Sequence, residues 1–153
     1  MNLCCDVIRE LQGKTLVTAE SLTGGGIGAA LTQVSGASAV YKGGVISYTN
    51  AVKNRILGVS QEILNQYGAV SEPVARAMAE GARKVLEADV AVSVTGLAGP
   101  GGDDYGNPVG TVFIGYSDAS VTEVKQFLFC GNRESIRKQT IEEALRLILS
   151  KSK

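Results

Sequence analysis

Residues 21–26 form a glycine-rich run, Ser-Leu-Thr-Gly-Gly-Gly, whose serine could act as a nucleophile. Glycines permit a tight turn and let backbone N–H groups approach a ligand, and the N-terminus of a following helix favours negative charge. A serine held beside such donors suits attack on a carbonyl, because the tetrahedral intermediate carries an oxyanion. The same run also suits simple capping of the helix by Ser21 or Thr23, and the run alone does not decide between these roles.

The chain contains no histidine, which limits how a serine could be activated. A Ser-His-Asp triad, a Cys-His pair and any His-ligated metal are excluded, so the base must be a lysine, a tyrosine or a carboxylate. Lys53 follows Tyr48 by five residues, and the two converge if Tyr48 ends a strand and Lys53 stands on the first helical turn beyond it. Lys53 serves as a base only if burial or a positive neighbour lowers its pKa. The alternative is a solvated helix lysine beside an ordinary sheet tyrosine.

A second glycine-rich segment, Thr-Gly-Leu-Ala-Gly-Pro-Gly-Gly over residues 95–102, is similar to loops that bind phosphates through backbone N–H groups. It is not a Walker A loop because no Gly-Lys-Ser/Thr follows, and a plain turn is the alternative interpretation. Arg133 could supply a forked cation for a phosphate or carboxylate, although its position also suits a surface role.

Hydrophobic patterning predicts the elements that position these segments. The predicted strands cover residues 14–19, 43–48, 89–94, 109–116 and 121–129. The predicted helices cover residues 2–12, a segment carrying Ile27, Leu31 and Val34, residues 50–57, 61–67 and 71–87, and a last helix that begins at Asn132.

Two of the predicted helices carry clear internal signals. The helix over residues 71–87 begins with a capping serine, Ser71, followed by an acid and a proline. Its expected buried stripe consists of Val74, Met78, Gly81 and Val85. The last helix is expected to direct Ile136, Ala144, Leu145 and Ile148 inward.

Strands alternate with helices early in the chain and form a hairpin late, which predicts a mixed sheet with helices on its faces. No linker, repeat or low-complexity stretch divides the sequence. We therefore predict a single three-layer α/β/α domain over residues 1–153, a length that buries roughly 68–70% of the unfolded surface. The polar segments 20–26, 48–53 and 95–102 follow predicted strands, so a shared pocket at the carboxyl ends of the sheet is expected.

Charge, hydropathy and cysteine usage narrow the classes of partner. The 15 basic and 15 acidic residues are spread along the chain, so there is no basic stripe of the kind that binds nucleic acid. No apolar stretch approaches the roughly 18–20 residues of a membrane span, and the first residues lack the order of a signal peptide. The three cysteines have no Cys-x-x-Cys spacing, which argues against a disulfide framework and a zinc site. We expect a cytoplasmic protein without a metal or cofactor, and a homodimer, because small α/β enzymes commonly form symmetric dimers.

Taken together, the segments resemble the CinA C-terminal domain family over nearly the whole chain. The resemblance lies in Thr-Ala-Glu-Ser-Leu-Thr-Gly-Gly (18–25), Gly-Val-Ile-Ser-Tyr-Thr-Asn-Ala-Val-Lys (44–53), Ala-Val-Ser-Glu-Pro-Val-Ala (69–75), Ser-Val-Thr-Gly-Leu-Ala-Gly-Pro (93–100) and Pro-Val-Gly (108–110). Members of that family, also called PncC, include nicotinamide-nucleotide amidases, which hydrolyse nicotinamide mononucleotide to nicotinate mononucleotide and ammonia without a metal.

The resemblance implies a serine nucleophile at Ser21, with Lys53 and Tyr48 as its activating partners. It also implies that Arg133, in a Gly-Asn-Arg segment similar to the family's Gly-Asp-Arg, meets the phosphate of a pyridine mononucleotide. The residues expected to bind this substrate are Thr23, Gly24, Gly25, Asn50, Thr95, Gly96 and Arg133. Backbone N–H groups of the turn over residues 21–26 would stabilise the oxyanion, each by about 3 kcal/mol.

Two departures from the family pattern bear on these expectations. Many relatives have cysteine where this chain has Leu22, so a thiol is not required for the chemistry, although substrate packing could differ. The family domain is often fused behind a larger N-terminal domain, whose activity is not assigned to this chain. The alternatives are a nucleotide-binding module without hydrolytic activity and an amidase for another small carboxamide.

Overall fold

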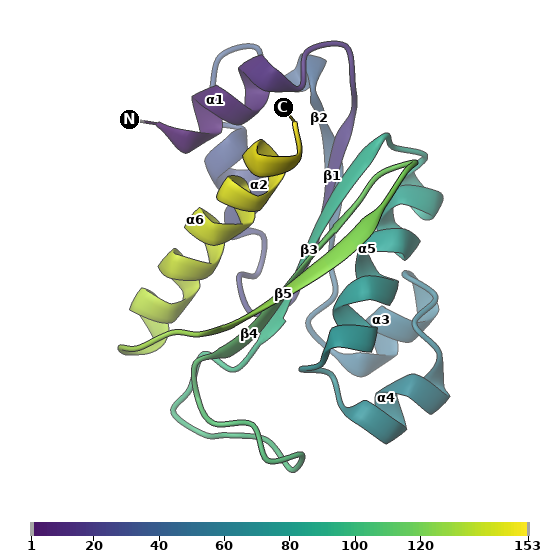
Figure 1. Cartoon of the computed structure of the whole chain (residues 1–153), viewed down its shortest axis with the longest axis vertical. Helices are drawn as coiled ribbons and strands as arrows, with labels where there is room; N and C mark the ends of the chain where they lie inside the picture. Colours follow the sequence, from purple (N-terminus) through teal and green to yellow (C-terminus); the bar gives the residue numbers. More distant parts are fainter. Residues whose placement is uncertain (1, 153) are drawn as a thin grey trace.

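The computed structural model describes residues 2–152, and its centre is a mixed sheet of five strands (Figure 1). The strands are β1 (Leu16–Glu20), β2 (Tyr41–Ile46), β3 (Val90–Gly96), β4 (Thr111–Ser117) and β5 (Thr122–Leu128). They lie in the order β2-β1-β3-β4-β5. The first three strands in this order are parallel to one another. Strand β4 pairs antiparallel with β3, and β5 pairs antiparallel with β4. The predicted mixed sheet and its late hairpin are confirmed.

Helices cover both faces of this sheet (Figure 1). The six α-helices of the described chain are α1 (Leu3–Glu10), α2 (Gly26–Leu31), α3 (Asn50–Arg55), α4 (Gln61–Tyr67), α5 (Glu72–Leu86) and α6 (Arg133–Lys151), and a 3-10 helix, η1, spans Ala37–Ala39. Helices α1, α2 and α6 cover one face, and α3, α4 and α5 cover the other. The predicted three-layer α/β/α arrangement is therefore confirmed.

Strand β1 is buried along its whole length because apolar side chains from both layers pack against it. Leu16 belongs to the apolar cluster shared with α1, α2 and α6. Val17 and Ala19 point to the opposite face and join the cluster that contains Val74 and Met78 of α5. A strand buried on both faces is expected at the centre of a parallel sheet, and it carries the chain directly to Ser21.

Helix α5 buries a different stripe from the predicted one. Val74 and Met78 are buried, but Val85 is 49% exposed, so its predicted inward position is wrong. The buried stripe is completed by Ala75, Ala79 and Ala82. These alanines let the helix lie close to the sheet. A Cβ atom at Gly81 would clash with the carbonyl oxygen of Leu57.

Two predicted details of helix ends are also wrong. The side chain of Ser71 does not cap α5; its hydroxyl donates to the carbonyl of Gly68 at 2.8 Å. Helix α2 ends at Leu31, so Val34 lies beyond it, where it is still partly buried. At α6, by contrast, the Asn132 side chain accepts from the N–H of Ser135, which confirms the predicted cap.

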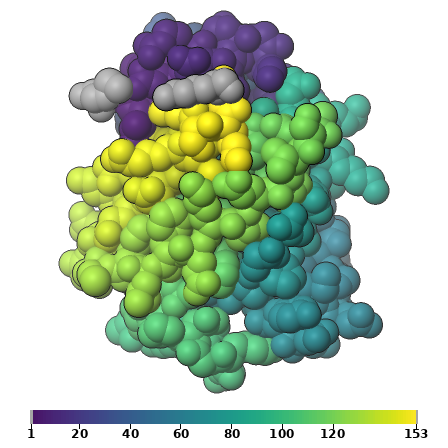
Figure 2. Space-filling view, viewed as in Figure 1, coloured from purple at the N-terminus to yellow at the C-terminus, as the bar shows by residue number. Residues whose placement is uncertain are grey.

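Helix α6 packs with its predicted residues inward, since Ile136, Ala144, Leu145 and Ile148 are all buried. Figure 2 shows this helix beside β5 on one face of the molecule, with the segment that follows β3 projecting at the lower end. Within residues 2–152, none of the helices has the length and apolar character needed to cross a membrane.

Candidate active site

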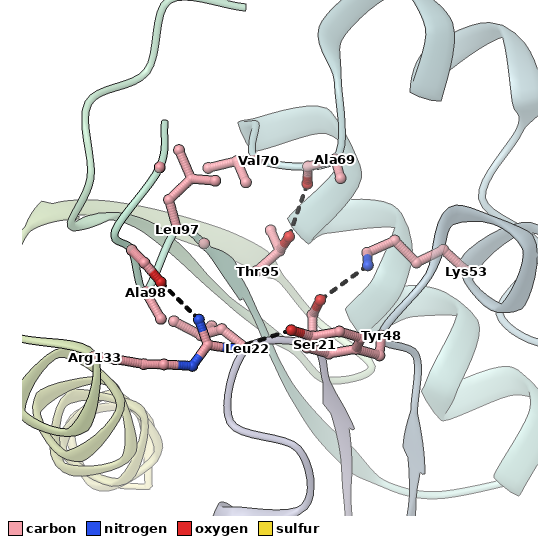
Figure 3. A pocket seen from close by; sticks show the side chains of 13 residues that line it. Ser21, Leu22, Tyr48, Lys53, Ala69, Val70, Thr95, Leu97, Ala98 and Arg133 are labelled. Carbon is pink, nitrogen blue, oxygen red and sulfur yellow. Dashed lines mark hydrogen bonds between the residues drawn. The ribbon is translucent and has the colours of Figure 1, made fainter. Parts of the chain in front are cut away.

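A cavity of about 300 Å³ lies beyond the carboxyl ends of the parallel strands β2, β1 and β3 (Figure 3). It is lined by Ser21, Leu22, Tyr48, Lys53, Ala69, Val70, Thr95, Gly96, Leu97, Ala98, Gly99, Gly101 and Arg133. The three polar segments expected to meet at the strand ends all contribute to this lining. Chain topology therefore brings together residues that are distant in sequence.

The ends of β2, β1 and β3 are tied together by backbone hydrogen bonds around the serine. The N–H of Ser21 donates to the carbonyl of Val94 in β3 at 3.1 Å. The N–H of Ser47, just after β2, donates to the carbonyl of Glu20 at 2.7 Å. These bonds place Ser21 directly above the sheet, between the segments that follow β2 and β3.

Lys53 contacts Ser21 from the second layer of helices (Figure 3). Thr49 caps α3 through its hydroxyl, which accepts from the N–H of Val52, and Lys53 is the fourth residue of that helix. Its Nζ donates to Ser21 Oγ at 3.0 Å and to the carbonyl of Ser47 at 2.7 Å. The side chain is 1% exposed, so the alternative of a solvated surface lysine is wrong.

Burial changes the acid–base behaviour of Lys53. Removal of the ammonium group from water lowers the pKa of Lys53 from 10.5 to about 8. No carboxylate forms an ion pair with this lysine anywhere in residues 2–152. Its neutral amine can therefore form near neutral pH, donate to Ser47 and accept the hydroxyl proton of Ser21.

Glu20 caps the helix that follows the glycine turn, a role that the sequence analysis missed. This carboxylate is 2% exposed, and its Oε1 accepts from the Thr23 hydroxyl at 2.6 Å and the Ile27 N–H at 2.9 Å. Its Oε2 accepts from the Gly28 N–H at 3.0 Å. Neither Ser21 nor Thr23 caps α2, so the simple capping interpretation is wrong. The sequence feature that could have predicted this cap is an acidic residue directly before the glycine turn.

Hydrogen bonds within the turn reduce the set of possible oxyanion donors. The N–H of Ser21 is bonded to Val94, that of Gly24 donates to Ser21 O at 3.1 Å, and that of Gly26 donates to Thr23 O at 2.9 Å. In the described part of the chain, the N–H groups of Leu22, Thr23 and Gly25 have no protein acceptor. Of these three residues only Leu22 lines the cavity, so the expectation that the whole turn supplies oxyanion donors is narrowed to the N–H of Leu22.

Tyr48 and Arg133 lie together at the mouth of the cavity (Figure 3). Tyr48 is 58% exposed, and its hydroxyl accepts from one Nη of Arg133 at 3.1 Å. The other Nη of Arg133 donates to the carbonyl of Gly99 at 2.7 Å. Arg133 thereby links the segment after β2 to the loop after β3. Within residues 2–152, the Tyr48 hydroxyl makes no hydrogen bond with Ser21 or Lys53.

The remaining residues expected to bind substrate separate into two groups. Thr95 and Gly96 line the cavity, and the Thr95 hydroxyl donates to the carbonyl of Ala69 at 2.8 Å. The others lie outside the lining: Thr23, Gly24, Gly25 and Asn50. Asn50 is the exposed first residue of α3, and Gly25 borders a separate cavity between α2 and β2.

An apolar wall completes the cavity and was missed in the sequence analysis. It consists of Leu22, Ala69, Val70, Leu97 and Ala98. An apolar wall combined with a few polar groups, here the serine and lysine at the base and the arginine at the mouth, is typical of small-molecule sites. Across residues 2–152, no three side chains of the His, Cys, Asp and Glu types gather into a group that could hold a metal ion.

Comparison with known proteins agrees with this architecture. Residues 4–152 match the model of the CinA C-terminal domain family. A CinA-like protein of Prochlorococcus marinus is 57% identical over 109 residues, which cover 71% of this chain and 25% of the relative. A CinA-like protein of Endomicrobium trichonymphae is 46% identical over 138 residues, which cover 90% of this chain and 32% of the relative. The chain thus spans about a quarter to a third of the length of these curated relatives.

Solved structures show the same fold. A competence-damaged protein (CinA) superfamily protein of Klebsiella pneumoniae superposes with a TM-score of 0.95 at 34% identity, covering 98% of this chain and 95% of that one. The competence/damage inducible protein CihA of Agrobacterium tumefaciens superposes with a TM-score of 0.95 at 37% identity, covering 99% and 94%. The family match over nearly all of the described residues, together with these superpositions, shows that the chain belongs to the CinA C-terminal domain family.

Proposed function

We propose that this protein is a nicotinamide-nucleotide amidase that hydrolyses nicotinamide mononucleotide to nicotinate mononucleotide and ammonia. The observation that carries the proposal is the hydrogen bond between Lys53 Nζ and Ser21 Oγ, 3.0 Å long, in a buried site whose lysine pKa is lowered to about 8. A serine paired with a poorly solvated lysine has the two groups that nucleophilic amide hydrolysis needs.

In the first half of the reaction, neutral Lys53 takes the hydroxyl proton as Ser21 Oγ bonds to the carboxamide carbon. The resulting oxyanion accepts a hydrogen bond from the backbone N–H of Leu22, directly after Ser21. The C–N bond then breaks, and the leaving nitrogen takes a proton from the Lys53 ammonium and departs as ammonia. Tyr48 lines the same cavity, and its hydroxyl would assist this proton transfer once Arg133, its present partner, turns to the phosphate.

In the second half, water attacks the ester formed between the mononucleotide's nicotinoyl group and Ser21. Lys53, neutral again, accepts a proton from the water as the new C–O bond forms. Collapse of the second tetrahedral intermediate breaks the bond to Ser21 Oγ, which recovers its proton from Lys53. The products are nicotinate mononucleotide and the unmodified enzyme, and each half-reaction uses the same base.

The cavity has suitable groups for a pyridine mononucleotide. The apolar wall that includes Leu22, Val70 and Leu97 offers a surface for the pyridine ring. Arg133 at the mouth is the expected partner of the phosphate, since a guanidinium forms paired hydrogen bonds with phosphate oxygens. On binding, this arginine would exchange its present acceptors, Tyr48 and Gly99, for the phosphate.

The direct test is ammonia release by purified protein incubated with nicotinamide mononucleotide. The Ser21→Ala variant should release none and still bind the nucleotide in a calorimetric titration. Ser120→Ala, on the exposed loop between β4 and β5, is the matched control and should retain full turnover. Well-folded protein that binds the nucleotide but releases no ammonia would contradict the proposal and favour a binding module. Faster turnover of nicotinamide riboside, which lacks the phosphate, would favour another small carboxamide as substrate.

A further inference from the structure

Arg137 on α6 contacts the turn that carries Ser21, although 115 residues separate Arg137 from Leu22. Its Nε donates to the carbonyl of Leu22 at 3.0 Å, and one Nη donates to the carbonyl of Thr23 at 3.1 Å. The arginine is half-buried, and within residues 2–152 no carboxylate pairs with it. Its hydrogen bonds therefore go to two neutral carbonyls of the catalytic turn rather than to an acidic partner.

These carbonyls belong to the backbone that carries the unpartnered N–H groups. In a planar trans peptide the C=O and N–H bonds point in opposite directions, so fixing the oxygen also fixes the hydrogen. The carbonyl of Ser21 accepts from the Gly24 N–H at 3.1 Å, which orients the N–H of Leu22. The bond from Arg137 to the Thr23 carbonyl fixes the N–H of Gly24 in the same way, and this N–H is the group that donates to Ser21 O.

The charge of Arg137 adds to this geometric effect. Hydrogen bonds from an ionised donor are stronger than neutral ones, and chains of hydrogen bonds polarise one another. A guanidinium on the Thr23 carbonyl makes the Gly24 N–H of the same amide a better donor to Ser21 O. The polarised Ser21 carbonyl in turn makes the Leu22 N–H a better donor. It also places positive charge beside the turn where an oxyanion would form.

We propose that Arg137 is a positioning residue that aligns and polarises the oxyanion donor at Leu22. It does not line the cavity, so it acts through the turn and not on the substrate. The inference rests on the proposed function, because it requires Ser21 to be a nucleophile. It is distinct from the expected role of Arg133, which lies one helical turn earlier and contacts the mouth of the cavity.

The test uses two reactions of the full chain. The first is labelling of Ser21 by a fluorophosphonate, in which the Oγ–P bond forms, fluoride leaves and Lys53 takes the serine proton. The second is ammonia release from nicotinamide mononucleotide. Arg137→Ala should slow labelling and lower kcat by about 10- to 100-fold, with KM changed less than about twofold, because the donor that acts on the intermediate is disturbed. Added guanidinium ion at millimolar concentration should restore part of both rates.

Two further variants separate positioning from general stability. Arg137→Lys keeps the charge but lacks the planar guanidinium that donates to both carbonyls at once. Its labelling rate and kcat should therefore lie between those of Arg137→Ala and the unaltered protein. It also carries the test if Arg137→Ala does not fold. Arg146→Ala, on the same helix but exposed and paired with Glu143, is the matched control and should label at the normal rate.

The inference is overturned if folded Arg137 variants label at the normal rate, if guanidinium fails to restore a slowed Arg137→Ala variant, or if the unaltered protein does not label at Ser21. A different pair of results is expected if nicotinamide mononucleotide is not the substrate. In that case the unaltered protein labels at Ser21 but releases no ammonia, and the labelling rates of the variants still decide the role of Arg137.

Discussion

Lys53 Nζ lies 3.0 Å from Ser21 Oγ, although 32 residues separate the two in sequence. They meet because β1 and β2 are parallel neighbours, so the segments that follow both strands emerge at the same edge of the sheet. The same packing that brings the two groups together removes Lys53 from water. The contact and the lowered pKa of Lys53 therefore have a common structural cause.

The pH dependence of turnover should report the ionisation of Lys53. Because burial lowers the pKa of Lys53 to about 8 and only the neutral amine is a base, kcat/KM should rise with pH and level off above that value. About a tenth of the molecules carry the neutral amine at pH 7 and about half at pH 8. Rates measured from about pH 6 to pH 10 provide the check. Lys53→Arg, whose guanidinium stays charged, should be inactive throughout, and a flat profile for the unaltered protein would contradict Lys53 as the base.

The buried lysine should also reduce the stability of the fold. Burial lowers the pKa of Lys53 from the ordinary 10.5 to about 8. This difference means that the folded state disfavours the charged form of Lys53 by about 3 kcal/mol. Lys53→Met should therefore raise the free energy of unfolding at pH 7 by about 1–3 kcal/mol, less than the full amount because Ser47 loses a donor. The sign follows from proton binding: between pH 8 and 10.5 the unfolded chain binds more protons than the native state, so the unaltered protein gains stability there.

Urea denaturation of Lys53→Met and the unaltered protein at several pH values is the measurement. The advantage of the methionine variant should be full below pH 8 and shrink as pH rises toward 10.5. A variant that is less stable than the unaltered protein at pH 7 would show that the hydrogen bonds of Lys53 outweigh its desolvation.

Tyr48 and Arg133 should affect turnover in different ways. Tyr48→Phe should lower kcat by about 10- to 100-fold if its hydroxyl assists proton transfer. Arg133→Met should instead raise KM for the mononucleotide and leave the weaker reaction of the riboside nearly unchanged, because only the mononucleotide carries a phosphate. Since Tyr48 accepts from Arg133 at 3.1 Å, the double variant should be non-additive by about 0.5–1.5 kcal/mol. An unchanged kcat in Tyr48→Phe would place this hydroxyl outside the proton path.

Glu20 should be required for a stable catalytic turn. Its two carboxylate oxygens accept four hydrogen bonds, from Thr18, Thr23, Ile27 and Gly28. Glu20→Gln replaces one acceptor oxygen by a donor NH2 group, so it should cost about 1–3 kcal/mol in the free energy of unfolding. Glu62→Gln, an exposed acid in the first turn of α4, is the matched control and should cost less than about 0.5 kcal/mol. Equal urea midpoints for the two variants would argue against the capping role.

Much of the architecture could be predicted from local patterns. Alternating strands and helices and the late hairpin sufficed for a mixed three-layer fold, because burial periodicity is a local property of the chain. The absence of histidine and the position of Lys53 after Tyr48 also indicated a possible pair of Ser21 with Lys53. The stripe of α5 was predicted less well. Alanine is too weak a signal to mark a buried face, so the pattern predicts a buried Val85 and does not reveal the buried Ala75, Ala79 and Ala82.

The sequence by itself thus determined the classes of residue available for chemistry and the order of the elements that carry them. Only the tertiary structure decided that Lys53 is buried against Ser21, that Glu20 rather than Ser21 caps α2, and that Asn50 lies outside the cavity. The tertiary structure also brings Arg137 into hydrogen-bond contact with Leu22, 115 residues away in sequence. The physical reason is that hydrogen-bond partners and solvent access depend on contacts between distant segments, whereas helix and strand patterns depend on neighbours along the chain.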